Sequence, residues 1–156
     1  MASLRILLMR HAEKPEDPLD PGLSPAGHAR AEKLAAYIPK TFGMPDFLFA
    51  AAVSKHSERP YQTLKPLSRE IDLSIDTAFT DQDYEGLGRQ LLSKERFAGK
   101  LVVVCWHHGY IPSFADVLKA KPGAYPDPWD PAVFNLVLRF EMRDDVSSVE
   151  PIIEPF

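Results

Sequence analysis

The chain has 156 residues, of which 45% are hydrophobic and 26% charged, a composition typical of one soluble globular domain over residues 1–156. A formal net charge of -4 argues against a nucleic-acid partner or a polybasic membrane surface, so any anion site must be a local cluster of basic residues. The single cysteine, Cys105, excludes an internal disulfide and favours a reducing compartment. No leader pattern opens the chain and no stretch approaches the ~18 apolar residues of a membrane span, so we expect a cytoplasmic protein.

The first predicted strand is the apolar run Leu4 to Met9, which ends in Arg10 and His11. Ligands of open α/β sheets bind at the edge where the parallel strands end. A guanidinium group matches phosphate oxygens, and an imidazole is neutral and nucleophilic near pH 7, so this pair suits an anionic substrate. The acidic, proline-rich residues 13–22 lack the spacing of a metal site and are predicted to form a solvated loop.

A helix is predicted after Ser24, which can cap it, and Pro25, which suits its first position. Its apolar face consists of residues at helical spacing, namely Ala31, Leu34, Ala35 and Ile38. The apolar run 47–53 is the next predicted strand, and it leads into a second helix that keeps an apolar face up to Ile71. Arg59 lies at the start of this helix, where backbone N–H groups also favour an anion.

An acidic segment follows a short strand that is predicted within residues 73–79. Asp81, Asp83 and Glu85 precede or begin a third helix, whose N-terminus their charges would stabilise. One of these carboxylates is alternatively a proton donor at the site. The sequence does not choose between the two roles.

The most strand-like run is Leu101 to Trp106, and it is followed directly by His107 and His108. Adjacent side chains of a strand point to opposite faces, so one of the two histidines should face the site, and the pair is a poor metal chelate. Cys105, in the middle of the run, is predicted to be a core residue rather than a nucleophile. A fourth apolar helical face then extends to Leu118.

The last part of the chain contains a loop and two strands. The proline-rich residues 119–130 are long enough to fold over the sheet edge, with Tyr125 and Trp129 as walls. Val133 to Phe140 and Val149 to Ile153 are predicted to complete the sheet. The alternation of strands and helices predicts a layered α/β domain.

Four ordered motifs within roughly residues 5–118 resemble those of the histidine phosphatase superfamily, also called phosphoglycerate mutase-like. They are Leu8 to Ala12 for the family's Arg-His-Gly/Ala signature, Leu23 to Gly27 for the opening of its first helix, Arg59 to Thr63 for its Arg-Ala-x-Gln-Thr element, and Trp106 to Gly109 for the strand end with its second histidine. In size the chain is similar to small bacterial members without a cap domain. The resemblance implies a three-layer α/β/α sandwich with a mostly parallel central sheet.

The resemblance also implies a phosphomonoester hydrolase that works through a phosphohistidine. His11 would attack phosphorus, and water would later hydrolyse the phosphohistidine. Arg10, Arg59 and the second histidine would neutralise the charge of the phosphoryl oxygens without a metal or another cofactor. The substrate would be a phosphorylated small molecule or a phosphoprotein.

Two assignments within this site stay open. The second histidine is His108, which precedes a glycine as in many family members, or His107, which the spacing to Ile111 favours, and we favour His108. By position along the chain, Glu85 or Asp83 would be the proton donor, and we take Glu85 as the first candidate.

Two other functions are compatible with the sequence. One is a catalytically weak phosphate-binding regulatory module, which would accumulate phosphoenzyme without turnover. The other is a phosphoglycerate mutase-type phosphoryl transferase, although the short chain leaves little room for the insertions that enclose such a substrate. The sequence specifies neither the substrate nor the oligomeric state.

Overall fold

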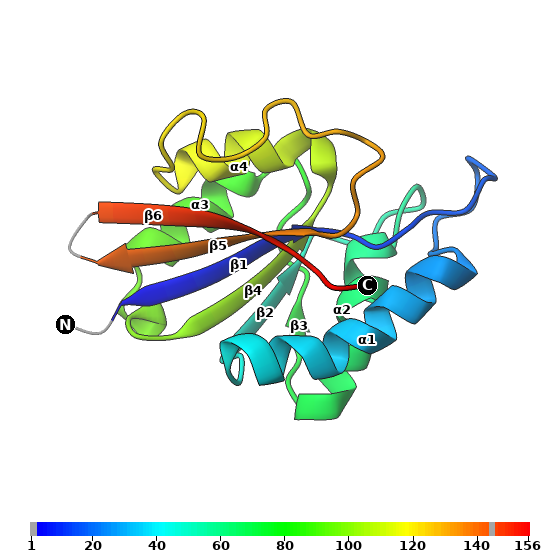
Figure 1. Ribbon diagram of the computed structural model, residues 1–156, viewed down its shortest axis with the longest axis horizontal. Helices are drawn as coiled ribbons and strands as arrows, with labels where there is room; N and C mark the ends of the chain where they lie inside the picture. Colours follow the sequence, from blue (N-terminus) through cyan, green and yellow to red (C-terminus); the bar gives the residue numbers. More distant parts are fainter. Residues whose placement is uncertain (1–2, 144–145) are drawn as a thin grey trace.

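A six-stranded sheet with the strand order β3-β2-β4-β1-β5-β6 forms the centre of the protein (Figure 1). The computed structural model describes residues 3–143 and 146–156. The strands are β1 (Leu4–Arg10), β2 (Phe47–Ala50), β3 (Ile75–Asp76), β4 (Leu101–Trp106), β5 (Leu136–Arg143) and β6 (Val146–Ile153). Strands β1 to β4 are parallel, β5 is antiparallel to β1, and β6 is antiparallel to β5. The mostly parallel sheet that the sequence predicts is therefore confirmed.

Helices cover both faces of this sheet (Figure 1). Helices α1 (Pro25–Phe42) and α2 (Arg59–Ile71) lie on one face, and α3 (Tyr84–Ser93) and α4 (Ile111–Val117) lie on the other. Two short 3-10 helices, η1 (Glu95–Phe97) and η2 (His108–Tyr110), flank β4. Within residues 3–143 and 146–156, no helix combines the length and the apolar character needed to cross a membrane.

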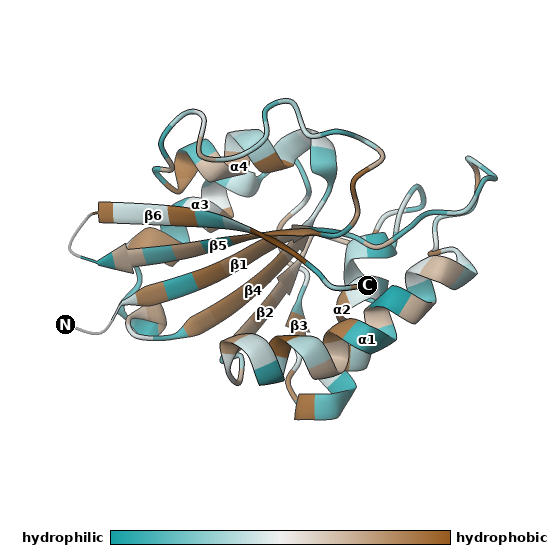
Figure 2. Cartoon of the chain, viewed as in Figure 1, coloured by the Kyte–Doolittle hydropathy of each residue, from teal (hydrophilic) through white to brown (hydrophobic). Residues whose placement is uncertain are grey.

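Strand β1 shows why three layers form. Ile6 and Leu8 belong to the apolar cluster of α3 and α4, whereas Leu7 and Met9 belong to the cluster of α1 and α2. Successive side chains of a strand point to opposite faces, so a continuous apolar run such as β1 needs cover on both. The central strands are correspondingly the most hydrophobic part of the chain (Figure 2). The α/β/α sandwich follows from this pattern.

The boundaries of several predicted strands differ from the observed ones, and two of these differences lie near the expected site. The strand predicted over residues 47–53 ends at Ala50, and the one predicted from Val133 begins at Leu136. At the second boundary the carbonyl groups of Pro131 and Val133 accept hydrogen bonds from Arg10, so this backbone serves the end of β1 rather than the ladder. The difference lies at the edge of the sheet where the candidate site is expected.

Helix α1 begins as the sequence predicts, and its first turn packs on the loop after His11. The Ser24 hydroxyl accepts a hydrogen bond from the Gly27 N–H at 3.0 Å, and Pro25 occupies the first turn. A Cβ atom at Gly27 would overlap the Glu13 carbonyl group, so only glycine allows this approach. The helix thereby supports the backbone two residues beyond His11.

Candidate functional site

The parallel pairing of β1 with β4 places two histidines side by side. Arg10 is the register partner of Trp106, and the His11 N–H donates to the Trp106 carbonyl group at 3.1 Å. His107 directly follows the last residue of β4. Its ring packs edge to face on that of His11, with the ring centroids 5.4 Å apart. His108 begins η2 and stays near enough to Arg10 for that charge to lower its pKa, after burial. The ring that packs on His11 thus belongs to His107, whereas the sequence favoured His108.

His11 is held in one tautomer. Its Nδ1 lies 2.7 Å from the Ala12 carbonyl oxygen. A carbonyl oxygen only accepts, so Nδ1 carries the proton and Nε2 keeps its lone pair. Burial, and then the charges of Arg10 and other neighbours, lower the pKa of His11 to about 3. The ring is therefore neutral at pH 7, with a nucleophilic Nε2.

Arg10 is buried beside His11, with 3% of its surface exposed. Its Nη1 donates to the Pro131 and Val133 carbonyl groups, and its guanidinium carbon lies 3.8 Å from the centre of the Phe134 ring. Its Nε is also buried and has no hydrogen-bond partner within residues 3–143 and 146–156. Burial and the nearby Arg59 charge lower its pKa to about 10, which leaves it cationic at pH 7. An unused donor on a buried cation is suited to an anion.

Arg59 approaches the same place from the start of α2. Its Nε and Nη2 donate to the carbonyl groups of Gly22 and Asp20 at 3.0 and 2.7 Å, and its Nη1 lies 3.4 Å from the Ser57 hydroxyl oxygen. Its charge acts on Arg10, on His11 and on His107, lowering the pKa of each. The structure therefore brings together the two arginines that the sequence assigned to different strand ends.

Neither arginine of this cluster forms an ion pair with a carboxylate among the described residues. The ion pairs found there involve other cations, namely Arg30, Arg89, Arg139 and Arg143. Backbone carbonyl groups instead hold Arg10 and Arg59. The charges of Glu13 and Asp130 act on Arg10, and that of Asp20 acts on Arg59, but only from beyond ion-pair distance. Among the described residues, two guanidinium groups therefore lie beside neutral imidazoles without a direct carboxylate contact, in a protein whose net charge is -4.

Helix α2 also holds the backbone on either side of the cluster. The Thr63 hydroxyl accepts from the Ala12 N–H at 2.9 Å and donates to the Arg59 carbonyl group. The Gln62 side-chain carbonyl accepts from the Leu23 N–H at 3.0 Å. Sequence reasoning missed these contacts, although both residues belong to the motif that begins at Arg59.

Phe134 is a second residue that sequence reasoning missed. Its ring lies under the Arg10 guanidinium group, and its centroid is 6.2 Å from that of His11. Trp129, which was predicted as a wall, is instead buried, and its Nε1–H donates to the Val133 carbonyl group at 3.0 Å. Trp129 therefore supports the segment that holds Arg10. In the sequence, Phe134 falls inside a predicted strand, and no local pattern there indicated a contact with Arg10.

The three candidate proton donors lie in different surroundings. Asp83 caps α3, since its carboxylate accepts from the Gly86 N–H, and this confirms the capping interpretation for Asp83. Glu85 is 60% exposed and pairs with Arg89 at 3.5 Å. Burial lowers the pKa of His107, and the nearby Asp81 charge partly offsets that lowering. The Asp81 backbone carbonyl group accepts from the Trp106 indole at 2.9 Å. Of the three, Asp81 is the carboxylate tied to the imidazole cluster.

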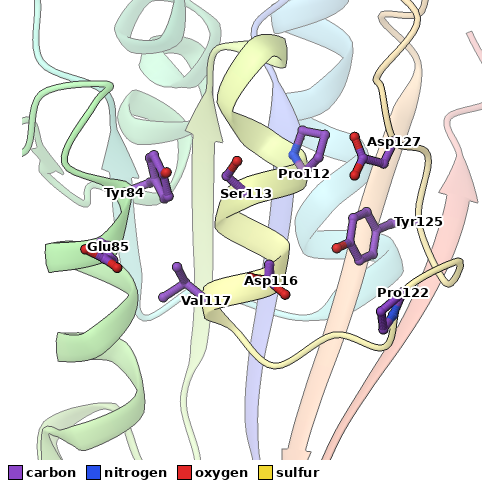
Figure 3. Close-up of a pocket in the computed structure, with 9 residues that line it drawn as sticks. All are labelled: Tyr84, Glu85, Pro112, Ser113, Asp116, Val117, Pro122, Tyr125 and Asp127. Carbon is purple, nitrogen blue, oxygen red and sulfur yellow. The ribbon is translucent and has the colours of Figure 1, made fainter.

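Glu85 also lines a separate hollow of about 410 Å³ between α3, α4 and the loop before β5 (Figure 3). Tyr125 reaches into this hollow from the loop, opposite Tyr84 at the start of α3 (Figure 3). The predicted wall Tyr125 is therefore assigned to this hollow and not to the surroundings of His11.

The remaining chemistry-bearing groups contribute little to this site. Cys105 is fully buried in β4, and burial raises the pKa of its thiol, which confirms that it is a core residue. Among residues 3–143 and 146–156, no three His, Cys, Asp or Glu side chains are grouped as a metal ion would require.

Several solved structures share the fold of this chain. A presumed α-ribazole-5'-phosphate phosphatase of Escherichia coli matches with a TM-score of 0.70 and 12% identity, over 97% of each chain. The protein histidine phosphatase SixA, complexed with tungstate, matches at 0.63 and 17%, over 96% of each chain. A mycobacterial glucosyl-3-phosphoglycerate phosphatase, with inorganic phosphate, matches at 0.58 and 15%, over 97% of this chain and 96% of the other. No protein-family model matches the sequence, and no curated protein sequence matches it.

The fold is therefore that of the phosphoglycerate mutase-like proteins, and the predicted resemblance to the histidine phosphatase superfamily is confirmed at the level of the fold. The similarity extends over nearly the whole length of each compared chain. Identities of 12–17% relate the folds and leave the chemistry to the residues of the site itself.

The lowered pKa of His11 predicts that its ring does not titrate near neutral pH. In NMR spectra of ring-labelled protein, the His11 signals, assigned by their loss in His11→Ala, should stay at neutral-imidazole positions from about pH 8 down to about pH 5. In urea-unfolded protein the same ring should titrate near the ordinary value of about 6.5.

The lowered pKa of His11 also makes the free energy of unfolding depend on pH. Between pH 6.5 and about 3 the unfolded chain binds a proton at His11 that the folded chain does not, so this residue lowers the free energy of unfolding as the pH falls. A folded-state titration of His11 above pH 6 would contradict the assignment.

Proposed function

We propose that the protein is a phosphatase of the histidine phosphatase type, which hydrolyses phosphomonoesters through a phosphohistidine on His11 without a metal ion. The observation that carries the proposal is the neutral His11 imidazole beside two guanidinium groups that have no carboxylate partner. A phosphoryl dianion supplies the missing charge, and guanidinium donors match its oxygens.

Binding begins with the unused donors of the cluster. The Nε–H of Arg10, which has no partner among the described residues, and the Nη1 group of Arg59, whose contact with the Ser57 hydroxyl is long at 3.4 Å, are the donors that a phosphoryl group would take up. The other hydrogen bonds of both side chains go to backbone carbonyl groups. These carbonyl groups hold the donors in place before the substrate arrives. Such preorganised charge stabilises the equatorial oxygens as the transition state develops.

His11 is the nucleophile in this proposal. Its Nε2 lone pair forms a bond to phosphorus while the bond from phosphorus to the leaving oxygen breaks. The Ala12 carbonyl group keeps the proton on Nδ1, so Nε2 does not need to lose one first. Water then attacks phosphorus, the phosphorus to Nε2 bond breaks, and inorganic phosphate is released.

We assign the role of second histidine to His107, because its ring packs directly on that of His11. From this position it can donate a hydrogen bond to a phosphoryl oxygen held between the rings. His108 lies at the edge of the same cluster and contributes less in this assignment.

The leaving oxygen needs a proton, which a carboxyl group would supply from its protonated form, and two candidate side chains remain. Glu85, the first candidate by position along the chain, is mostly exposed and paired with Arg89. Asp81 is the carboxylate whose charge acts on His107. We therefore propose Asp81 as donor in place of Glu85 and Asp83.

The names of the compared structures support an oxyanion site of this kind. SixA is described in complex with tungstate, and the mycobacterial phosphatase with inorganic phosphate. For this chain we propose the general class of phosphorylated small molecules or phosphoproteins as substrates. The single, buried Cys105 supports a reducing, cytoplasmic location.

The hydrolase is tested with a generic aryl phosphate. The wild-type protein should turn it over equally well with and without a chelator, and His11→Ala should lose this activity by about a thousandfold or more, because the nucleophile is gone. A phosphoenzyme should be trapped by rapid acid-free quenching of the wild type only. Loss of activity with the chelator would show that the metal-free mechanism is wrong, and a phosphoenzyme burst without turnover would indicate a binding module.

The two neighbouring histidines provide a matched pair of variants. His107→Ala should lower kcat by about a hundredfold, the magnitude typical of removing a donor to the transition state, whereas His108→Ala should change it by less than about tenfold. Steady-state kinetics of both variants measures the difference. The reverse order would restore the assignment of His108.

The donor is tested by removing one carboxylate at a time. Asp81→Asn should lower kcat by about a hundredfold for a phosphomonoester with a poor, alkyl leaving group, and much less for an aryl phosphate whose leaving oxygen needs no proton. Glu85→Gln serves as the control and should change kcat by less than about twofold. Equal losses for the two leaving groups in Asp81→Asn would contradict a donor role.

A further inference from the structure

Beside the site lies a guanidinium group with a different set of partners. Arg30 of α1 donates from Nε and Nη2 to both oxygens of the Glu13 carboxylate, at 2.9 to 3.2 Å. Its Nη1 donates to the Glu154 carboxylate at 2.9 Å and to the Phe156 carbonyl group at 2.8 Å. All three nitrogens are therefore engaged by the protein. Arg30 is thus unlike Arg10, whose Nε has no partner.

The residue that Arg30 holds is two positions from His11. The Glu13 carbonyl oxygen accepts from the N–H and the hydroxyl of Ser24, at 3.0 and 3.2 Å. The Glu13 side-chain carboxylate forms an ion pair with the Arg30 guanidinium group. On the other side, the Ala12 N–H donates to Thr63 at 2.9 Å. The segment that links His11 to the acidic loop is therefore fixed at consecutive residues.

The Ala12 carbonyl group belongs to the peptide unit between Ala12 and Glu13. A peptide unit is planar, and the groups on either side of this one, the Ala12 N–H and the Glu13 carbonyl oxygen, are both hydrogen-bonded, which restricts the rotation of the Ala12 carbonyl group. The same oxygen accepts from His11 Nδ1 at 2.7 Å. A continuous set of contacts thus runs from Glu154 through Arg30 and Glu13 to the nucleophilic ring.

We propose that Arg30, held by Glu154, is a positioning residue for His11, keeping the Ala12 carbonyl group where it fixes the His11 tautomer and ring orientation. The inference rests on the proposed function, in which His11 Nε2 is the nucleophile. Arg30 does not bind the phosphoryl group. Its loss lowers the rate of the chemical step and leaves the affinity for an oxyanion unchanged, since Arg10 and Arg59 remain.

Burial of the two carboxylates supports this role. Glu154 is 2% exposed at its side chain, and burial, with the Glu13 charge as a smaller contribution, raises its pKa to about 7 although Arg30 lowers it. Burial raises the pKa of Tyr37 and of Cys105, and the Glu154 charge adds to the rise of each, so both groups lie within reach of this carboxylate. One guanidinium group thus offsets two neighbouring carboxylates. Without it, Glu154 takes up a proton more readily and the Glu13 carboxylate loses the two nitrogens that hold it, and Glu13 is the one of the two attached to the site backbone.

The test replaces the Arg30 guanidinium group and measures three quantities separately: the rate of hydrolysis, the affinity for an oxyanion and the tautomer of His11. Arg30→Gln should lower kcat for an aryl phosphate by about tenfold to a hundredfold, while KM and the Kd for tungstate change by less than about twofold. Arg30→Lys keeps the charge without the fork and should recover part of the rate. NMR of the ring-labelled protein should show that the Nδ1–H tautomer of His11 is less populated in Arg30→Gln. Arg139→Gln, which breaks an exposed ion pair between β5 and β6, is the matched control and should change none of these values.

The following results decide the proposal. A folded Arg30→Gln with wild-type kcat and tautomer overturns it, and so does a Kd for tungstate that rises as much as kcat falls. If Arg30→Gln does not fold, Glu154→Gln, compared with Glu150→Gln as control, takes its place under the same criteria. If the wild type turns over no phosphate ester, the proposed function has failed, and the His11 tautomer in these variants alone decides whether Arg30 positions the ring.

Discussion

The site depends on a buried cation that the protein solvates without neutralising it. Removing the Arg10 guanidinium group from water costs several kcal/mol, and a carboxylate partner would offset that cost while occupying the site. The structure uses the carbonyl groups of Pro131 and Val133 and the face of Phe134 instead. These partners occupy the Nη1 group and one face of the Arg10 guanidinium group, and they do not neutralise its positive charge. This requirement also explains the path of the chain before β5. Strand β5 begins only after the backbone carbonyl groups that accept hydrogen bonds from Arg10.

The same division of roles separates the arginines of this chain. Arg10 and Arg59 are held by neutral carbonyl groups and keep their charge for an oxyanion, whereas Arg30 is saturated by carboxylates and acts within the protein. Their chemical type is the same, and only their partners differ. An argument from residue type alone therefore cannot assign their functions, because a guanidinium group is a ligand-binding group only where the fold leaves its donors unpaired.

The fold also explains why the substrate stays a general class. Proteins named for quite different phosphate compounds share this architecture with the chain at 12–17% identity. In the proposed function, the end of β1, the start of α2 and the end of β4 build the part of the site that would meet a phosphoryl group. The loops before β5 surround it, and they are the segments in which chains of one fold differ most.

Local patterns in the sequence determined the elements, the Ser24 cap, the core position of Cys105, the placement of Arg10 and His11 at the end of the first strand and that of Arg59 at the start of the second helix. These features depend on neighbours within a few residues, so spacing and residue type suffice to predict them. Only the tertiary structure decided that His107 packs on His11 and that Phe134 lies under Arg10. These contacts join residues about a hundred positions apart, and they follow from the register of β4 against β1 and the late start of β5. Because a shift of one residue in that register exchanges the faces of two adjacent histidines, no local pattern could choose between them.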